Sequence, residues 1–256
     1  MLSARTFSSL LALAMLTGVA ATTSPLLADV YELRTYTTNP DKLENLNARF
    51  RDHTVALFTK HGMESVGYWT PTAEPASANT LVYVLRHKSR DAAKASWKAF
   101  LGDPEWKKVA AESQRDGRIL AKAPESVFMD LADYSPKAAT KKTTDDGVYE
   151  LRIYRCNPEK LAGLDARFRD HTLELFRRHG IQSVAYWHPT DAPAAKDTLI
   201  YLLKHDSPAA AKKSWDAFRA DPEWTKVAEE SQKDGKFLRE APEVTFLKAT
   251  DYSALK

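Results

Sequence analysis

The chain has 256 residues, of which 43% are hydrophobic, so it is long and apolar enough for one large or two small globular domains. Its 37 lysines and arginines nearly balance its 34 aspartates and glutamates, and these charges are interspersed rather than grouped, so no nucleic-acid partner is expected. The single cysteine, Cys156, excludes an intrachain disulfide.

The first 28 residues form a predicted signal peptide. Arg5 is their only charged residue, and an apolar run covers residues 10–21. That run is shorter than the roughly 20 residues needed to span a bilayer. We expect cleavage near Ala21 or near Ala28 and a mature protein that is periplasmic or secreted, without a transmembrane segment. A mitochondrial transit peptide is the alternative, because Ser and Thr are frequent and no acidic residue precedes Asp29.

An internal repeat covers the remaining sequence at a constant offset of 118 residues. Tyr-Glu-Leu-Arg occurs at residues 31–34 and 149–152, and Arg-Phe-Arg-Asp-His-Thr occurs at residues 49–54 and 167–172. Tyr-Trp and Asp-Pro-Glu-Trp recur with the same offset. We therefore predict a first domain at residues 29–135, a linker without large apolar residues at 136–147 and a second domain at 148–256.

The first copy begins with a predicted strand at residues 30–37, where apolar and polar residues alternate. A helix is predicted at residues 40–61, because Leu43, Leu46, Phe50, Leu57 and Phe58 share one helical face before Gly62. The other predicted elements are strands at 65–70 and 80–87, a helix at 89–101, a further helical stretch ending before Gly117, and a closing strand at 126–131.

The order of these elements, βαββαβ, is that of a ferredoxin-like α+β unit. Helices cover one face of such a sheet, and a second unit in the same chain can cover the other face. We therefore predict an intrachain pseudo-dimer in which two four-stranded sheets form an eight-stranded α+β barrel. Its interior is either filled by side chains or left as a small ligand cavity.

Four motifs resemble the NIPSNAP family in both copies. In the first copy they are the opening strand Tyr-Glu-Leu-Arg-Thr-Tyr, the helical Phe-Arg-Asp-His, the strand Gly-Tyr-Trp and the tryptophan-containing second helix. The resemblance implies a dimeric α+β barrel, and for the family it implies binding roles linked to mitochondria or vesicles. The wider superfamily includes small monooxygenases, isomerases and haem-handling proteins. The predicted signal peptide and the tandem form resemble an exported bacterial member.

The first strand of each copy carries a polar face, formed by Glu32, Arg34 and Tyr36 in the first copy. We predict that the apolar face packs under the helices and that these polar residues face the barrel interior. There they would line a ligand site with their counterparts in the second copy, Glu150, Arg152 and Tyr154. The alternative is a Glu–Arg pair that only ties neighbouring strands together.

His53 and His171 occupy the same position in the apolar stripe of the first helix of each copy. Such a histidine is either a buried core residue or a functional residue at the barrel mouth that transfers a proton or binds a cofactor. In the catalytic interpretation, Arg34 or Arg152 steadies an oxyanion.

Trp69 and Trp187 lie on predicted strands, and His87 and His205 end the third strand of each copy. We predict these four as ligand contacts in the cavity or at its rim, with core packing as the alternative. The histidines lack the close spacing of a metal site, so none is expected. The sequence also lacks a Gly-rich phosphate loop, a nucleophile elbow and a CxxC motif, so no cofactor is expected.

Three functional hypotheses follow from these residues. The first is a binding module for a small, largely apolar ligand or for a partner protein. The second is a cofactor-independent monooxygenase or isomerase that acts on an aromatic or quinone-like substrate. The third is a purely structural interaction role, and self-association into a homo-oligomer remains open.

Overall fold

The computed structural model describes residues 29–136 and 147–255. The predicted signal peptide and all but the ends of the predicted linker lie outside the described residues. The first half (residues 29–136) contains β1 (Val30–Thr37), α1 (Leu43–Arg49), the π-helical turn η1 (Phe50–Thr54), α2 (Val55–Lys60), β2 (Glu64–Pro71), the 3-10 turn η2 (Ala76–Ala78), β3 (Thr80–His87), α3 (Arg90–Gly102), α4 (Pro104–Glu112) and β4 (Glu125–Leu131).

The second half (residues 147–255) repeats these elements in the same order. They are β5 (Val148–Arg155), α5 (Leu161–Arg167), η3 (Phe168–Thr172), α6 (Leu173–Arg178), β6 (Gln182–Pro189), η4 (Ala194–Lys196), β7 (Thr198–His205), α7 (Pro208–Ala220), α8 (Pro222–Ser231) and β8 (Glu243–Ala249). The predicted βαββαβ order is confirmed in both halves. No helix of the described residues is long and apolar enough to cross a membrane.

Local sequence signals explain where the second pair of helices begins. The side chain of Ser89 accepts a hydrogen bond from the amide of Ala92, which caps the start of α3. Asp103 caps α4 in the same way by accepting from the amide of Glu105, at 2.8 Å, and Pro104 occupies the first helical position. The Asp-Pro pair therefore ends one helix and starts the next.

The helix predicted at residues 40–61 contains a π-helical turn. The amide of Val55 bonds to the carbonyl of Phe50, five residues earlier, and the hydroxyl of Thr54 donates to the carbonyl of Arg49 at 3.1 Å. The wider turn shifts the helical register, so Thr54 is buried and His53 is exposed. The prediction that His53 lies on the apolar face is therefore wrong. His171 is exposed for the same reason, after the equivalent turn η3.

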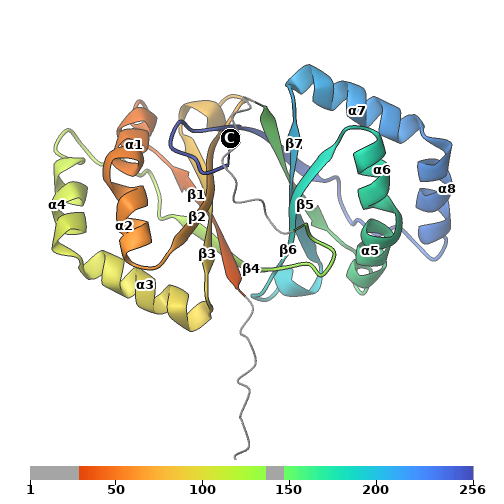
Figure 1. Ribbon diagram of the computed structural model, residues 1–256, viewed down its shortest axis with the longest axis horizontal. Helices are drawn as coiled ribbons and strands as arrows, with labels where there is room; N and C mark the ends of the chain where they lie inside the picture. The colour runs from red at the N-terminus through yellow and green to blue at the C-terminus, as the bar shows by residue number, and fades with distance from the viewer. Residues whose placement is uncertain (1–28, 137–146, 256) are drawn as a thin grey trace, which may run out of the picture.

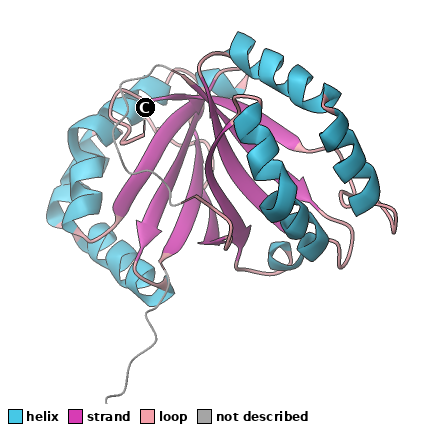
Figure 2. Ribbon diagram, turned by 45° about the vertical axis from the view of Figure 1, so that its right-hand side comes forward, coloured by secondary structure: helices cyan, strands magenta, loops and turns pink. Residues whose placement is uncertain are grey.

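The eight strands form one closed antiparallel barrel in the order β1-β3-β2-β8-β5-β7-β6-β4. The halves meet where β2 pairs with β8 and β4 pairs with β6. Figure 1 shows the strands in the middle and the helices of the two halves on opposite flanks, and Figure 2 shows the same layers from another side. The predicted intrachain α+β barrel is confirmed.

The barrel interior is filled with apolar side chains. Tyr31 and Leu33 of β1 point into it, together with Trp69, Trp187 and aliphatic residues from the other strands. The remaining cavity has a volume of about 10 Å³, roughly the space for one water molecule. The barrel interior is therefore a packed core.

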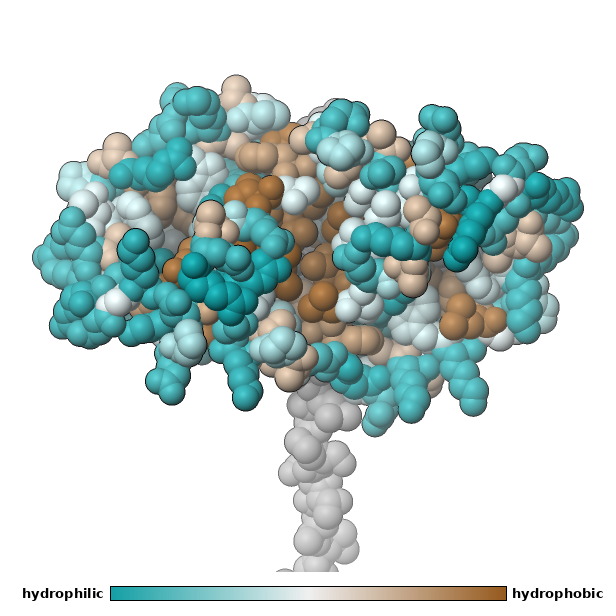
Figure 3. Space-filling view, turned by 180° about the vertical axis from the view of Figure 1, so that it is seen from behind, coloured by the Kyte–Doolittle hydropathy of each residue, from teal (hydrophilic) through white to brown (hydrophobic). Residues whose placement is uncertain are grey.

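Apolar residues also reach the surface between the two halves, where Figure 3 shows them gathered in the middle of one face.

The end of each half docks against the other half. Arg51 Nε donates to Asp251 Oδ2 at 2.6 Å, and Arg169 Nη2 donates to Asp133 Oδ1 at 2.7 Å. The amides of Tyr68 and Tyr186 donate to the hydroxyls of Ser253 and Ser135. These reciprocal contacts add to the two strand pairings and fix the halves against each other.

Candidate functional site

A crevice of about 580 Å³ lies between the sheet and the helices of the first half. Its floor is β1, which contributes Arg34 and Tyr36, and its walls come from α1 to α4 and from residues 114–124. The walls are aromatic, and the rings of Phe100 and Trp106 pack at 4.4 Å between centroids. A crevice of this size is typical of a small-molecule site.

Glu32 organises the polar groups at the floor of this crevice. Its Oε1 accepts from Arg34 Nη1 at 2.5 Å and from the hydroxyl of Ser126 at 2.6 Å. Its Oε2 accepts from Trp97 Nε1 at 2.7 Å and from His87 Nε2 at 3.0 Å. The four donors come from β1, β4, α3 and β3, so the carboxylate ties the sheet to the helix above it. Only 1% of its side chain is exposed.

These contacts hold Glu32 in its charged form. Burial raises the pKa of Glu32, but the hydrogen bond from His87, the charge of Arg34 and the bonds from Ser126 and Trp97 outweigh burial and lower it to about 2. The carboxylate is thus an acceptor with both oxygens occupied by donors. It positions its neighbours and has little capacity to take a proton from a ligand near neutral pH.

Arg34 presents its guanidinium group to the crevice. Its terminal carbon lies 4.3 Å from the ring centre of Trp97, and 14% of its side chain is exposed. Its buried Nε has no hydrogen-bond partner among the described residues. Burial lowers the pKa of Arg34, but Tyr83, Tyr36 and Glu32 raise it above the ordinary arginine value. The group therefore remains a cation, and its buried Nε is unpaired among the described residues.

Arg49 is a second cation of the crevice wall. It is 7% exposed, its terminal carbon lies 5.3 Å from the ring centre of Trp106, and its Nη1 reaches the hydroxyl of Ser113 at 3.4 Å. Burial lowers the pKa of Arg49. No described carboxylate forms a salt bridge with it, and its buried Nε is also without a described partner. A buried cation in such surroundings favours binding of an anion.

The second half repeats the polar cluster around Glu150. This carboxylate accepts from Arg152 Nη1, from His205 Nε2 at 2.8 Å and from Trp215 Nε1 at 2.8 Å. Val244 stands where the first half has Ser126, so the fourth donor is missing. The crevice of this half measures about 260 Å³, and Tyr154 and Arg167 are among the residues that line it.

The structure corrects the predicted direction of the polar strand face. Glu32, Arg34 and Tyr36 face the helices, as do Glu150, Arg152 and Tyr154, and none of the six points into the barrel. The apolar residues of β1 and β5 point inward because the inner faces of the two sheets pack against each other. The polar set is accommodated under the helices because Trp97 and Trp215 donate to the carboxylates there.

The other predicted ligand contacts lie in different surroundings. His87 and His205 are buried beside the two carboxylates and reach the crevices only through them. Trp69 and Trp187 lie in the packed barrel interior, away from the crevices. The sequence interpretation missed Arg49 and Arg167, although each stands next to a phenylalanine within a motif that is identical in both copies.

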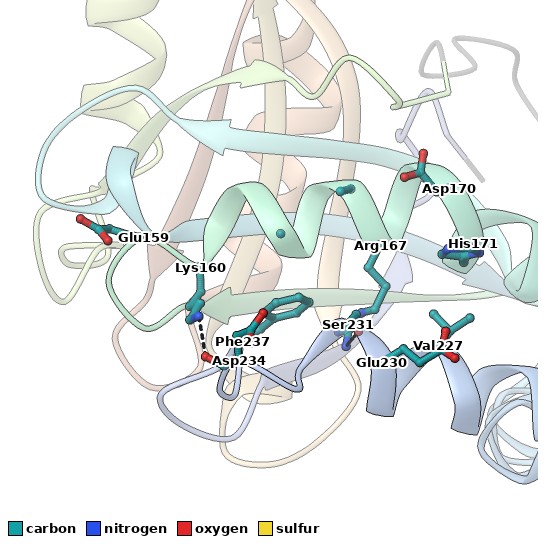
Figure 4. A pocket seen from close by; sticks show the side chains of 12 residues that line it. Glu159, Lys160, Arg167, Asp170, His171, Val227, Glu230, Ser231, Asp234 and Phe237 are labelled. Atoms are coloured by element: carbon teal, nitrogen blue, oxygen red, sulfur yellow. Dashed lines mark hydrogen bonds between the residues drawn. The ribbon is translucent and has the colours of Figure 1, made fainter.

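His53 and His171 line an outer groove between the first helix and the last helix of each half. The groove measures about 510 Å³ in the second half and about 300 Å³ in the first. Figure 4 shows His171 and Asp170 on one side of the groove and Glu230 on the other. Arg167 lines both the groove and the inner crevice of its half, as Arg49 does in the first half. The histidines and Arg34 therefore belong to different cavities.

Comparison with solved structures places the barrel in a broad structural class. A protein from Lactobacillus acidophilus described as a candidate monooxygenase superimposes with a TM-score of 0.55 at 10% identity, covering 88% of this chain and 98% of that one. A candidate monooxygenase from Fusobacterium nucleatum gives 0.53 at 14% identity, covering 87% and 92%. An anthrone oxidase-like protein gives 0.55 at 12% identity, covering 88% and 93%. These likenesses show a shared fold.

The sequence comparisons identify the family. No curated protein sequence matches the chain. The NIPSNAP family model matches it twice, at residues 31–136 and 149–254, which together cover most of both described halves. The two matches coincide with the two repeats, and the solved structures share the barrel that these repeats form. The chain therefore belongs to the NIPSNAP family and carries two tandem NIPSNAP domains in one α+β barrel.

Proposed function

We propose that this protein binds a small, largely apolar molecule with an acidic oxygen in the crevice of its first half. The aromatic walls suit a flat apolar body. Four cationic residues line the crevice, namely Arg34, Arg49, Arg118 and Lys122, and no carboxylate is among its lining residues. Such a lining favours an organic anion over a neutral or cationic ligand.

The observation that carries this proposal is that Arg49 is a buried cation without a described carboxylate partner. Burial of a guanidinium without a carboxylate partner is costly, and a bound carboxylate, phenolate or enolate would offset that cost. Arg34 supports the same interpretation, because Glu32 occupies only one of its terminal nitrogens and 14% of its side chain is exposed at the crevice. Both arginines line the crevice, Arg34 at its floor and Arg49 in its wall.

Binding is better supported than proton abstraction. Both oxygens of Glu32 already accept hydrogen bonds, and His87 donates to that carboxylate from a buried position. The crevice thus offers cations to an existing anion and no unoccupied carboxylate base. A stable complex with an acid is the simplest consequence.

Isothermal titration with two tricyclic probes tests the proposal. We expect 9-anthracenecarboxylate to bind and the neutral 9-anthracenemethanol to bind at least about tenfold more weakly, because a hydrogen bond to a charged group contributes roughly 1.5–3 kcal/mol. Arg34→Met and Arg49→Met should each weaken binding of the acid by about tenfold or more. Arg51→Met is the control, since Arg51 is a surface arginine that pairs with Asp251. Equal binding of both probes, or full affinity in both variants, would reject the proposal.

A second candidate function is the oxidation of an aromatic ketone by molecular oxygen. The specific observation in its favour is Arg34, whose guanidinium group lines the crevice and could stabilise an enolate oxygen. Anthrone is the test substrate suggested by the anthrone oxidase-like structure. Its methylene carbon would lose two hydrogens and gain one oxygen atom, giving anthraquinone, while the other oxygen atom leaves as water. Oxygen uptake equal to the buffer rate would reject this candidate.

The predicted base role of His53 or His171 is tested separately. Both lie in the outer grooves, so His53→Gln and His171→Gln should leave binding of the tricyclic acid unchanged. Loss of anthrone oxidation in the double variant, with binding retained, would support a catalytic role. Retained oxidation would remove both histidines from the mechanism.

The location of this function is also a proposal. The charge pattern and apolar run of residues 1–28 support export to the periplasm or secretion. N-terminal sequencing of the protein recovered from the periplasm should give a mature start near residue 22 or 29. An intact leader on cytoplasmic protein would contradict it.

A further inference from the structure

The two halves differ in charge at the mouth of their crevices. The backbone there is the same, because Thr38 bridges to Leu120 in the first half and Cys156 bridges to Leu238 in the second. Four equivalent side chains differ: Thr37, Asn79, Ala121 and Lys122 in the first half are Arg155, Asp197, Arg239 and Glu240 in the second.

In the second half these side chains form an ionic network. Arg239 pairs with Asp197 and its Nε lies 3.8 Å from Glu240. Arg155 pairs with Glu243 and its Nη1 lies 3.5 Å from Glu240. The network ties β5, the residue before β7 and the segment before β8 to one another. In the first half only the local pair of Lys122 and Glu125 stands at this place.

The crevices differ at the same end. Residues 122–124 and Arg34 line the first crevice, which measures about 580 Å³. Their counterparts, residues 240–242 and Arg152, do not line the second crevice, which measures about 260 Å³. The volume that is missing in the second half therefore lies beside the ionic network.

The charges at the two crevice mouths, like the two crevice volumes, favour the first crevice as the anion site. Lys122 adds a cation to the mouth of the first crevice, and Glu240 places a carboxylate at the equivalent position of the second half. Arg155 and Arg239 offset Asp197 and Glu240, so these four positions carry no net charge in the second half and one positive charge in the first. This difference of one charge favours anion binding in the first half over the second.

We infer that the two halves have separate roles: the first crevice binds one organic anion per chain, and the ionic network keeps the second crevice closed to it. This inference rests on the proposed function and adds which half holds the ligand and which side chains exclude it from the other. The second half then has a structural role, because its strands complete the barrel. Arg155, Arg239 and Glu240 are the residues that determine this asymmetry.

Native mass spectrometry and titration with 9-anthracenecarboxylate test the inference on the full chain. We expect one probe molecule per wild-type chain. Arg34→Met should weaken binding by about tenfold or more, and Arg152→Met should change it by less than about twofold. The triple change Arg155→Thr, Arg239→Ala and Glu240→Lys gives the second half the residues of the first at three of these four positions. It should raise the stoichiometry to two, and adding Arg152→Met should return it to one.

The outcomes separate this inference from the proposed function. Two probe molecules per wild-type chain, one lost with each arginine, would overturn the inference and leave the proposed function standing. Binding that survives Arg34→Met and is lost with Arg152→Met would also overturn it. No binding to the wild-type chain would reject the proposed function itself. A triple variant that keeps wild-type circular dichroism and still binds one molecule would show that the network does not exclude the ligand.

Discussion

The most constrained residue of the candidate site is Glu32. Four donors from four different elements meet on one buried carboxylate, and two of them, Arg34 and Trp97, also line the crevice. Removing the charge would leave these donors with a weaker acceptor in a site that water reaches poorly. The stability of the first half and the position of Arg34 should therefore depend on the same carboxylate.

Replacing Glu32 tests this dependence through pH. In the folded protein the pKa of Glu32 is about 2, against an ordinary value of 4.5. A lowered pKa stabilises the fold above the unfolded value, and this stability is lost as pH falls from about 4.5 toward 2. The difference corresponds to roughly 3 kcal/mol. Glu32→Gln should lower the free energy of unfolding at pH 7 by about 2–4 kcal/mol and flatten its decline between pH 5 and 3.

Urea unfolding at several pH values measures both effects. Glu44→Gln is the matched control, because Glu44 is 76% exposed and makes a long, exposed salt bridge of 3.6 Å to Arg51. This control should change stability by less than about 1 kcal/mol. Parallel acid profiles for wild type and Glu32→Gln would show that the carboxylate is not responsible for the acid sensitivity.

At the scale of elements, the sequence predicts which residues share a face better than it predicts where that face points. Alternation in β1 separates Glu32, Arg34 and Tyr36 from Tyr31 and Leu33. It cannot tell which set the helices cover, because a polar set is stable there only if other elements donate to it. Trp97, distant in sequence, supplies that donor, and no local pattern indicates it. The repeat and the order of elements were predictable because they depend on local periodicity alone.

The π-helical turn shows the same limit in a helix. A stripe counted at α-helical spacing places His53 among apolar residues, but one wider turn moves it to the surface. Thr54 contributes to this turn through its side chain, because its buried hydroxyl donates a hydrogen bond to the carbonyl of Arg49. Such side-chain bonds to a helical carbonyl are not distinguishable from ordinary threonine positions by sequence alone.

Thr54→Val tests the contribution of this hydroxyl. Valine fills nearly the same space and removes the bond to the carbonyl of Arg49, so we expect the free energy of unfolding to fall by about 1–2 kcal/mol. Thr59→Val is the matched control, since Thr59 makes a similar bond to the carbonyl of Val55 at an exposed position. It should change stability by less than about 0.5 kcal/mol. Equal effects in urea unfolding would mean that the turn does not need the hydroxyl.

At the scale of the whole molecule, the two halves are related by pseudo-twofold symmetry. Trp69 faces Ala249 where β2 meets β8, and Trp187 faces Leu131 where β6 meets β4. The docking pairs Arg51–Asp251 and Arg169–Asp133 follow the same relation. Each half thus presents one surface to its counterpart, as a subunit does in a symmetric dimer. The apolar inner face of each sheet is buried only through this pairing.

We therefore expect residues 29–136, expressed alone, to form a homodimer with the same barrel. Trp69 would face Leu131 of the second copy, and Arg51 would pair with Asp133, so no like charges meet at these contacts. A monomer would expose the apolar face that now fills the barrel interior, at roughly 25 cal/mol for each Å². Light scattering after size exclusion should give twice the mass of the half-chain at micromolar concentration.

Two neighbouring substitutions in this half-chain separate assembly through the inner face from nonspecific association. Met129 is completely buried in the barrel interior, whereas the side chain of Asp130, the next residue of β4, is exposed. Met129→Lys should abolish the dimer, because the lysine charge would be buried without a partner, and Asp130→Lys should leave it intact. A folded, stable monomer of the unmodified half-chain would contradict the argument. It would mean that a NIPSNAP domain can cover its sheet alone and that the tandem arrangement serves the crevices and not the core.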